Sequence, residues 1–128
     1  MEKDHSIQTF QEGDLKVQIE ESKYIIKISW LGQCTLKNPS FFLDPILTEQ
    51  YGESQKSIKR MVFDFTKFKF MNSSAIIPII RILKMAKDSR ASVHVLYNQN
   101  ERWQSILLGE LKIFETEDGR IQVLGANH

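Results

Sequence analysis

Cysteine, proline and glycine are scarce in this chain of 128 residues, which has one, three and six of them respectively. A single cysteine, Cys34, can neither form a disulfide within the chain nor supply the thiolate cluster of a structural zinc site. The low proline and glycine content excludes a collagen-like or low-complexity chain. Stability therefore has to come from packing, for which the 41% hydrophobic content is sufficient.

Long hydrophobic runs and an excess of one charge are also missing. The longest uncharged stretch, from Phe70 to Ile80, is shorter than the roughly 18 apolar residues that a membrane span needs. The segment from Met1 to His5 lacks the basic start and apolar middle of a secretory signal. The 17 basic and 16 acidic residues leave a net charge of +1, which gives no global attraction to nucleic acid or anionic lipid. We expect one cytoplasmic domain over residues 1–128, without a membrane span or a nucleic-acid partner.

The first half of the chain has the pattern of an antiparallel sheet followed by a helix. Alternating apolar and polar residues predict strands at 7–10 and 15–20, joined in a hairpin. The run from Tyr24 to Trp30 is richer in β-branched and aromatic residues, which favours a strand nearer the centre of the sheet. Asn38 and Pro39 are typical of a helix start, and we expect this helix to end near Gly52. A basic, turn-prone connection should follow, over residues 53–60.

The second half alternates between strands and helices. From Ala75 onward, apolar residues follow a period of 3.6, with Arg81, Lys84 and Lys87 on or near the opposite face. The remaining patterns predict strands at 61–65, 91–97, 111–115 and 121–124, and a short helix at 101–108. Because Asp118-Gly119 is a turn signal, the last two strands should form a hairpin.

Together these elements predict an α/β fold: a single-domain mixed β-sheet with helices packed against it and β-hairpins at both ends. The core should span about 15–116, with mobile segments at 1–6 and 125–128. The chain shows neither an internal repeat nor a linker.

The segment most able to carry chemistry is the junction between the buried strand at 61–65 and the following helix. Asn72, Ser73 and Ser74 stand where the helix begins, and the first-turn N–H groups of a helix favour a bound anion such as a phosphoserine. Residues of these types also cap helices without any further role. Pro78 complicates both interpretations, because it either distorts the first turn or marks the start of regular helix.

The segment from Phe63 to Leu83 resembles the corresponding part of STAS domains, the family named for sulfate transporters and anti-sigma-factor antagonists. In that family a hydrophobic strand with an embedded Asp leads through a Phe- and Met-rich connection to an Asp-Ser-Ser/Thr-Gly motif ahead of an apolar helix. The order of elements from about Leu15 to Phe114 is similar too, including the segment that begins at Gly109. The resemblance thus covers most of the chain and implies a single-domain fold of the antagonist type.

What the resemblance implies for function is reversible phosphorylation. The motif's first Ser corresponds to Ser73, and Ser74 is the second hydroxyl and alternative acceptor. A partner serine kinase of the anti-sigma-factor type and a partner phosphatase would act on it and so regulate a downstream protein. Asn72 replaces the usual Asp, which keeps a capping oxygen but removes a charge, and Ala75 replaces the usual Gly. In this interpretation Asn72, Ser74 and Ala75 form the helix cap and recognition segment.

The sequence gives little support for a metal site, a catalytic nucleophile or a phosphate-binding loop. The three histidines, His5, His94 and His128, lack the spacing of a metal site, and Cys34 lacks the local signature of a nucleophile. The glycines are dispersed, so the chain lacks a phosphate-binding loop. We therefore assign neither catalytic residues, metal ligands nor cofactors, and expect a non-enzymatic regulator.

Two alternatives to the phosphorylation switch stay open. The first is a constitutive adaptor or assembly subunit in which the serines only cap the helix, and the second is a small ligand-binding protein or enzyme with a pocket near the same junction. Basic side chains on both sides of the junction could meet an acidic partner or the phosphate itself; these are Lys56, Lys59, Arg60, Lys67, Lys69, Arg81, Lys84 and Lys87.

Overall fold

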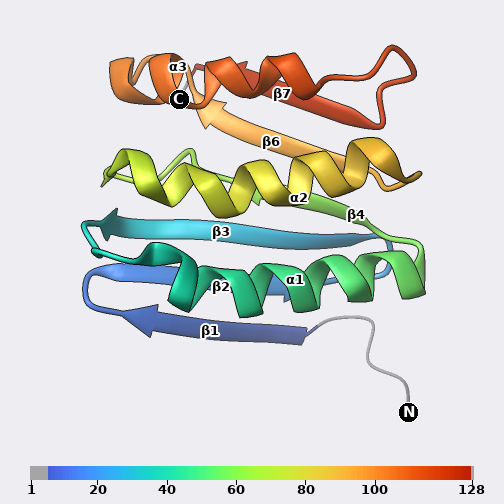
Figure 1. Cartoon of the computed structure of the whole chain (residues 1–128), viewed down its shortest axis with the longest axis horizontal. Helices are drawn as coiled ribbons and strands as arrows, with labels where there is room; N and C mark the ends of the chain where they lie inside the picture. The colour runs from blue at the N-terminus through green and yellow to red at the C-terminus, as the bar shows by residue number, and fades with distance from the viewer. Residues whose placement is uncertain (1–5, 128) are drawn as a thin grey trace.

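The computed structural model describes residues 6–127, which form a seven-stranded mixed sheet with helices on one face (Figure 1). Residues 1–5 and 128, which include His5, His128 and most of the segment expected to be mobile at the start, lie outside the described part. The sheet has the strand order β1-β2-β3-β4-β6-β7, while β5 pairs with the end of β3. The strands are β1 (Ser6–Glu12), β2 (Leu15–Glu21), β3 (Ile25–Cys34), β4 (Arg60–Asp64), β5 (Phe70–Met71), β6 (Val93–Asn98) and β7 (Ile121–Ala126).

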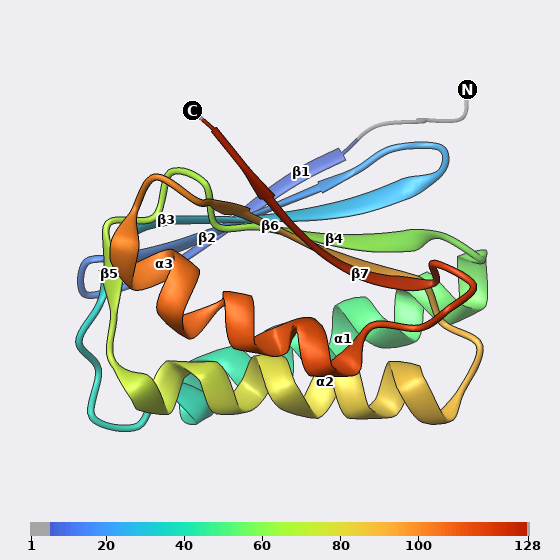
Figure 2. The same cartoon turned by 90° about the horizontal axis from the view of Figure 1, so that it is seen from above.

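The helices are α1 (Pro39–Ser57), α2 (Ile76–Asp88) and α3 (Arg102–Leu107), with short 3₁₀-helices η1 (Ser73–Ala75) and η2 (Gly109–Phe114). All three α-helices cover the same face of the sheet, as Figure 2 shows, and α2 runs between α1 and α3 (Figure 1). The pairs β1–β2 and β2–β3 are antiparallel, whereas β3–β4, β4–β6 and β6–β7 are parallel. The mixed sheet with packed helices and the hairpin at the start of the chain are therefore confirmed. None of the helices in the described part is long and apolar enough to cross a membrane.

The core fills the space between the sheet and the helices. Every second residue of β2 and β3 points into it, from Leu15 and Val17 to Ile28 and Trp30, and these four side chains are fully buried. Trp30 packs on Phe65 with ring centroids 4.9 Å apart. Full burial of each such side chain contributes about 1.5–3 kcal/mol, so this layer provides the packing that the lack of disulfides requires.

The amphipathic pattern of α2 is confirmed, and Pro78 explains how the helix starts. Ile79, Leu83 and Ala86 are buried, while Arg81 and Lys84 on the other side are exposed. A 3₁₀ turn precedes α2, and α2 itself begins two residues before Pro78. A proline fits in the first turn because the N–H it lacks would have no partner within the helix. Regular helix therefore begins near Pro78, and residues 73–75 before it form the 3₁₀ turn.

The end of α1 was predicted wrongly. The helix does not stop near Gly52 but continues to Ser57, so most of the expected turn-prone connection at 53–60 is helical. Gly52 has open space around it, while Ser54 is buried and its Oγ donates to the Tyr51 carbonyl at 2.7 Å. The helix ends at Ile58, which adopts the left-handed conformation that glycine usually provides at this position.

The expected strand at 111–115 and the terminal hairpin are also wrong. Residues 109–114 form the 3₁₀-helix η2. Its Leu111 and Phe114, with Leu108 just before it, recur every third residue and face the core. The last strand, β7, instead pairs in parallel with β6, in a register that ends at Asn98 opposite Ala126. Residues 125–126 therefore belong to the sheet rather than to a mobile tail.

Candidate functional site

The connection between β4 and α2 is bound to the sheet at two points. The main-chain N–H of Phe65 donates to the Leu96 carbonyl at 2.9 Å, and that of Lys69 donates to the Gly32 carbonyl at 2.8 Å. Strand β5 then pairs with the last two residues of β3 before the chain enters η1. The segment that carries the serines therefore starts from an anchored position.

Gln104 on α3 binds the first part of this connection, and sequence reasoning missed it. Its side chain is fully buried, and its Nε2 donates to the carbonyls of Phe65 at 2.7 Å and Phe68 at 3.0 Å. Its Oε1 accepts from the N–H of Asn98 at 2.7 Å. The signal in the sequence is a glutamine on the face of a short amphipathic helix that should be apolar. A buried amide with three partners stabilises the loop it contacts, because each of those polar groups would otherwise be unpaired.

Asp64 is the Asp embedded in the hydrophobic strand. It is the last residue of β4, and it carries a charge where the connection begins. Its Oδ1 accepts from the N–H of Thr66 at 2.9 Å and from the Thr66 hydroxyl at 2.6 Å, and Lys27 Nζ lies 3.5 Å from its Oδ2. Burial alone would raise the pKa of Asp64, but these hydrogen bonds and the Lys27 charge outweigh burial and hold it below its usual value. The carboxylate therefore fixes the turn after β4.

Asn72 stands at the N-cap position of η1, but the side-chain cap expected there is absent. Its Nδ2 instead donates to the Leu36 carbonyl at 2.9 Å, and its Oδ1 accepts from the Ser74 hydroxyl at 3.3 Å. The first-turn N–H of Ala75 is bound by the main-chain carbonyl of Asn72, at 3.1 Å. The amide thus joins the junction to the loop before α1 instead of capping the helix.

The two serines have different surroundings. Ser73 is exposed, and its hydroxyl makes no hydrogen bond within residues 6–127. Ser74 is half-buried and its hydroxyl is bound to Asn72. Ala75 is fully buried, so its methyl group packs in the core and cannot contribute directly to a recognition surface. Of the three, Ser73 is therefore the residue that another protein can reach.

Exposed apolar side chains lie around this end of the molecule. Phe70 and Ile77 are each 44% exposed and lie on either side of Ser73 in the sequence. Helix α1, whose first turn carries the 83% exposed Phe41, contacts η1. A shallow pocket of about 470 Å³ at the start of α1 is lined in part by Phe41 and Asp44. These side chains leave apolar surface exposed near the junction that carries Ser73.

The basic side chains named in the sequence do not form one patch. Lys67 and Lys69 are exposed on the connection before Ser73, and Arg81 of α2 forms an ion pair with Asp44 of α1. Lys56, Lys59 and Arg60 instead lie at the far end of the sheet, where α1 ends and β4 begins. The charges next to Ser73 are thus fewer than the sequence indicated.

Cys34 and His94 both have the surroundings of structural residues rather than of catalytic ones. Burial, which outweighs a hydrogen bond with the Leu36 main chain, raises the pKa of the Cys34 thiol, so it is a poor nucleophile. His94 Nε2 is 3.3 Å from the Gly119 carbonyl, and burial is the main reason that its pKa is lowered. Residues 6–127 contain no group of three or more His, Cys, Asp or Glu side chains that could hold a metal ion.

No protein-family model matches the chain, and no curated protein matches it. One solved structure that is similar is an uncharacterized protein of the DUF3478 family with a SpoIIAA-like fold, from Shewanella loihica PV-4. It is 16% identical, the match covers 97% of this chain and 89% of that chain, and the TM-score is 0.43. The SpoIIAA-like fold of that protein is the fold of the STAS antagonists.

Proposed function

We propose that the chain is a non-enzymatic regulatory protein whose binding to a partner switches with the reversible phosphorylation of Ser73. The observation that carries this proposal is the contrast between the two serines. The Ser73 hydroxyl is exposed and has no partner within residues 6–127, whereas that of Ser74 is bound to Asn72. An acceptor has to reach the catalytic site of another protein, which favours Ser73.

The contacts that anchor the junction support a switch. The β5 pairing, the Asn72 amide and Gln104 hold the backbone on both sides of the connection, so a phosphate on Ser73 would be presented in a defined place. Phosphorylation adds about −1.5 to −2 charges at neutral pH. Ser73 lies in η1, directly before the 13-residue helix α2, and the dipole of that helix favours this charge. Asn72 lacks the carboxylate that would repel it.

The exposed apolar side chains supply the binding that the phosphate would control. Phe41, Phe70 and Ile77 could be covered by a partner when Ser73 carries no charge. A phosphate placed beside them would have to be desolvated in such an interface, which weakens the complex. A serine kinase and a phosphatase would then be the enzymes that set the state, as the resemblance to antagonists implies.

A constitutive adaptor is the second candidate. It is favoured by the Asn72 side chain, which donates to Leu36 and has no charge with which to position a kinase. In that case Ser73 is unmodified, and the same apolar side chains bind one partner at all times.

The test is the intact mass of the protein isolated from the cells that make it, with and without phosphatase treatment, followed by fragmentation. A removable phosphate on Ser73 is the expected result. Partner capture should then differ between Ser73→Asp and Ser73→Ala, with Ser57→Ala, an exposed serine at the end of α1, as the matched control. An unmodified protein under all growth conditions, with identical capture by both Ser73 variants, would favour the adaptor.

A further inference from the structure

The two edges of the sheet differ in how their outer main-chain groups are bound. At β7 the chain covers its own edge. The Ile121 N–H donates to the Thr116 hydroxyl at 3.1 Å, and the Thr116 N–H donates to the Ile121 carbonyl at 3.2 Å. The Val123 N–H donates to a Glu115 carboxylate oxygen at 2.9 Å. Strand β1, at the other edge, pairs only with β2 within residues 6–127, and an open edge of this kind is a template for another strand.

Alternate residues of β1 direct their main-chain N–H and C=O groups away from β2. In an antiparallel sheet, successive residues of a strand form hydrogen bonds on opposite sides. The Asp14 carbonyl accepts from the Gln33 N–H of β3 at 3.2 Å, so the even-numbered residues that follow along β2 bond to β3 and the odd-numbered ones bond to β1. Because Phe10 lies opposite Val17, the even-numbered residues of β1 are those that bond to β2. The residues of β1 whose groups face outward are therefore Ile7, Thr9 and Gln11.

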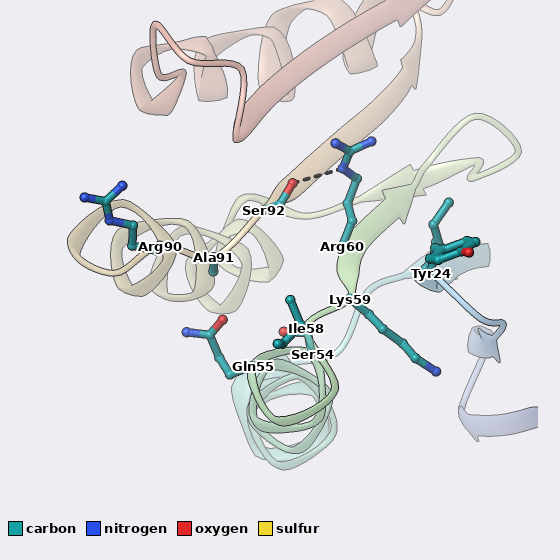
Figure 3. Close-up of a pocket in the computed structure, with 10 residues that line it drawn as sticks. Tyr24, Ser54, Gln55, Ile58, Lys59, Arg60, Arg90, Ala91 and Ser92 are labelled. Atoms are coloured by element: carbon teal, nitrogen blue, oxygen red, sulfur yellow. Dashed lines mark hydrogen bonds between the residues drawn. The ribbon is translucent and has the colours of Figure 1, made fainter.

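The β1–β2 hairpin is anchored to the rest of the sheet at both ends. At its turn, the Gln33 side chain donates to the Asp14 carboxylate at 3.3 Å. At the other end, Lys59 Nζ lies 2.7 Å from a Glu21 carboxylate oxygen and donates to the Ser22 carbonyl at 2.7 Å. Figure 3 shows the pocket beside this end, where the Lys59 side chain extends toward the strands coloured blue. A second strand would meet an edge already in place, which lowers the cost of ordering it.

Strand β1 lacks the features with which proteins usually block an open edge. It contains neither proline nor lysine, and its one charged residue, Glu12, is the last of the strand. Every residue of β1 except Phe10 is exposed, including Ile7 at 55%. In Figure 1, β1 lies beyond α1 at the lower edge of the sheet. Another strand can therefore reach β1 along its length.

We propose that two copies of the chain pair through β1, antiparallel and centred on Thr9, so that their sheets join into one. In this register Thr9 faces Thr9 of the second copy and Ile7 faces Gln11, so every outward-facing residue is paired, and each pair adds two main-chain hydrogen bonds. A threonine pair is favourable across neighbouring strands. Neither Ser73 nor its phosphorylation takes part in this contact, so the dimer forms whether or not the proposed switch exists.

The charges of the hairpin fit this register. Glu12 stands opposite Ser6 of the second copy, so like charges do not meet between the two β1 strands. On the face away from the helices, the row of side chains that starts at Lys16 of one copy ends at Glu20 of the other, which places opposite charges in one row. The contact uses the same strand of both copies, and the chain covers its own β7 edge. The assembly therefore closes at a dimer instead of growing into a fibre.

The test is sedimentation velocity of the unphosphorylated full chain, from about 1 μM to about 1 mM. The sedimentation coefficient should rise to that of a dimer and stop there. Thr9→Pro removes an outward N–H without breaking a bond to β2, because an edge strand tolerates proline at such a position, and should weaken the dimer at least about tenfold. Thr9→Val keeps this N–H, so it is the matched control and should dimerise like the parent. Circular dichroism of each variant confirms folding.

An exchange of charges at the same position tests the register. Thr9→Lys and Thr9→Glu should each weaken self-association, because identical charges would face each other across the symmetry axis. An equimolar mixture of the two variants should dimerise at least about tenfold more tightly than either variant alone. Leu124→Lys places a charge at an exposed position of β7, on the other edge, and should dimerise like the parent. The proposal is overturned if the chain stays monomeric at about 1 mM, if assemblies grow beyond a dimer, if Thr9→Pro dimerises unchanged, or if the mixture gains nothing.

Discussion

The buried side-chain amide of Gln104 donates a hydrogen bond of 2.7 Å to the main-chain carbonyl of Phe65, which lies 39 positions earlier in the chain. This contact joins α3 to the connection that leads to Ser73. It makes the position of the proposed phosphorylation site depend on a helix that is distant in sequence. The hydrogen bond should therefore contribute to the stability of the fold.

Replacing Gln104 by Leu should lower the free energy of unfolding by about 1–3 kcal/mol, because the Phe65 and Phe68 carbonyls and the Asn98 N–H lose their partner in a dry environment. Urea unfolding followed by circular dichroism measures the change. The matched control is Gln99→Leu, an exposed site where the change should stay within about 0.5 kcal/mol. Equal stabilities of the two variants would contradict the role assigned to Gln104.

Local patterns were enough to predict most of the sheet and the central helix. The alternation from Leu15 to Glu20 and the 3.6-residue period from Ile76 to Ala86 each reflect burial on one side of one element. The hairpin between β1 and β2 depends on neighbours in sequence, so its pairing could be predicted as well. These features require no knowledge of distant contacts.

The errors arose where distant contacts decide the structure. Residues 111–115 alternate like a strand, but β7 occupies the sheet edge beside β6, and a period of three lets Leu108, Leu111 and Phe114 pack beneath it instead. Gly52 looked like a helix end, yet burial of Ser54 favours a longer helix. At the candidate site, the serines could be identified from the sequence, whereas the link between Asn72 and Leu36 spans 36 positions and could not.

Replacing Ile58 by Gly should raise the free energy of unfolding by about 0.5–1 kcal/mol. The left-handed conformation costs a side chain with a Cβ about 1–2 kcal/mol, and the greater freedom of glycine in the unfolded state cancels part of the gain. At 91% exposure, little packing is lost. Thermal and urea unfolding measure the effect, with Ile58→Val as the control that keeps the strain and should show no gain. A loss of stability in Ile58→Gly would mean that the isoleucine side chain packs against the protein.

Replacing Arg120 by Met should destabilise the fold by about 1.5–3 kcal/mol, because three carbonyls near the end of α2 lose a charged donor. Stability should fall locally, near the end of α2, as well as for the whole fold. Hydrogen exchange should speed up most for the amides of Ser89 and Ala91, and less for those at the start of α2. Arg102→Met removes an exposed arginine and provides the comparison. Unchanged exchange at Ser89 would contradict the role assigned to Arg120 at the end of α2.

Asp118 should make the fold sensitive to acid. Hydrogen bonds from the Thr116 hydroxyl and the Arg120 main chain, together with the Arg120 side chain, lower the pKa of Asp118 from 3.8 to about 2. The unfolded chain therefore takes up a proton at a higher pH than the folded one, so the stabilisation present above pH 3.8 is lost as the pH falls toward about 2. Carboxyl-carbon NMR should give a midpoint for Asp118 near the lower value. Asp118→Asn should flatten the fall in stability over this interval, and an unchanged pH profile would show that the carboxylate is not coupled to folding.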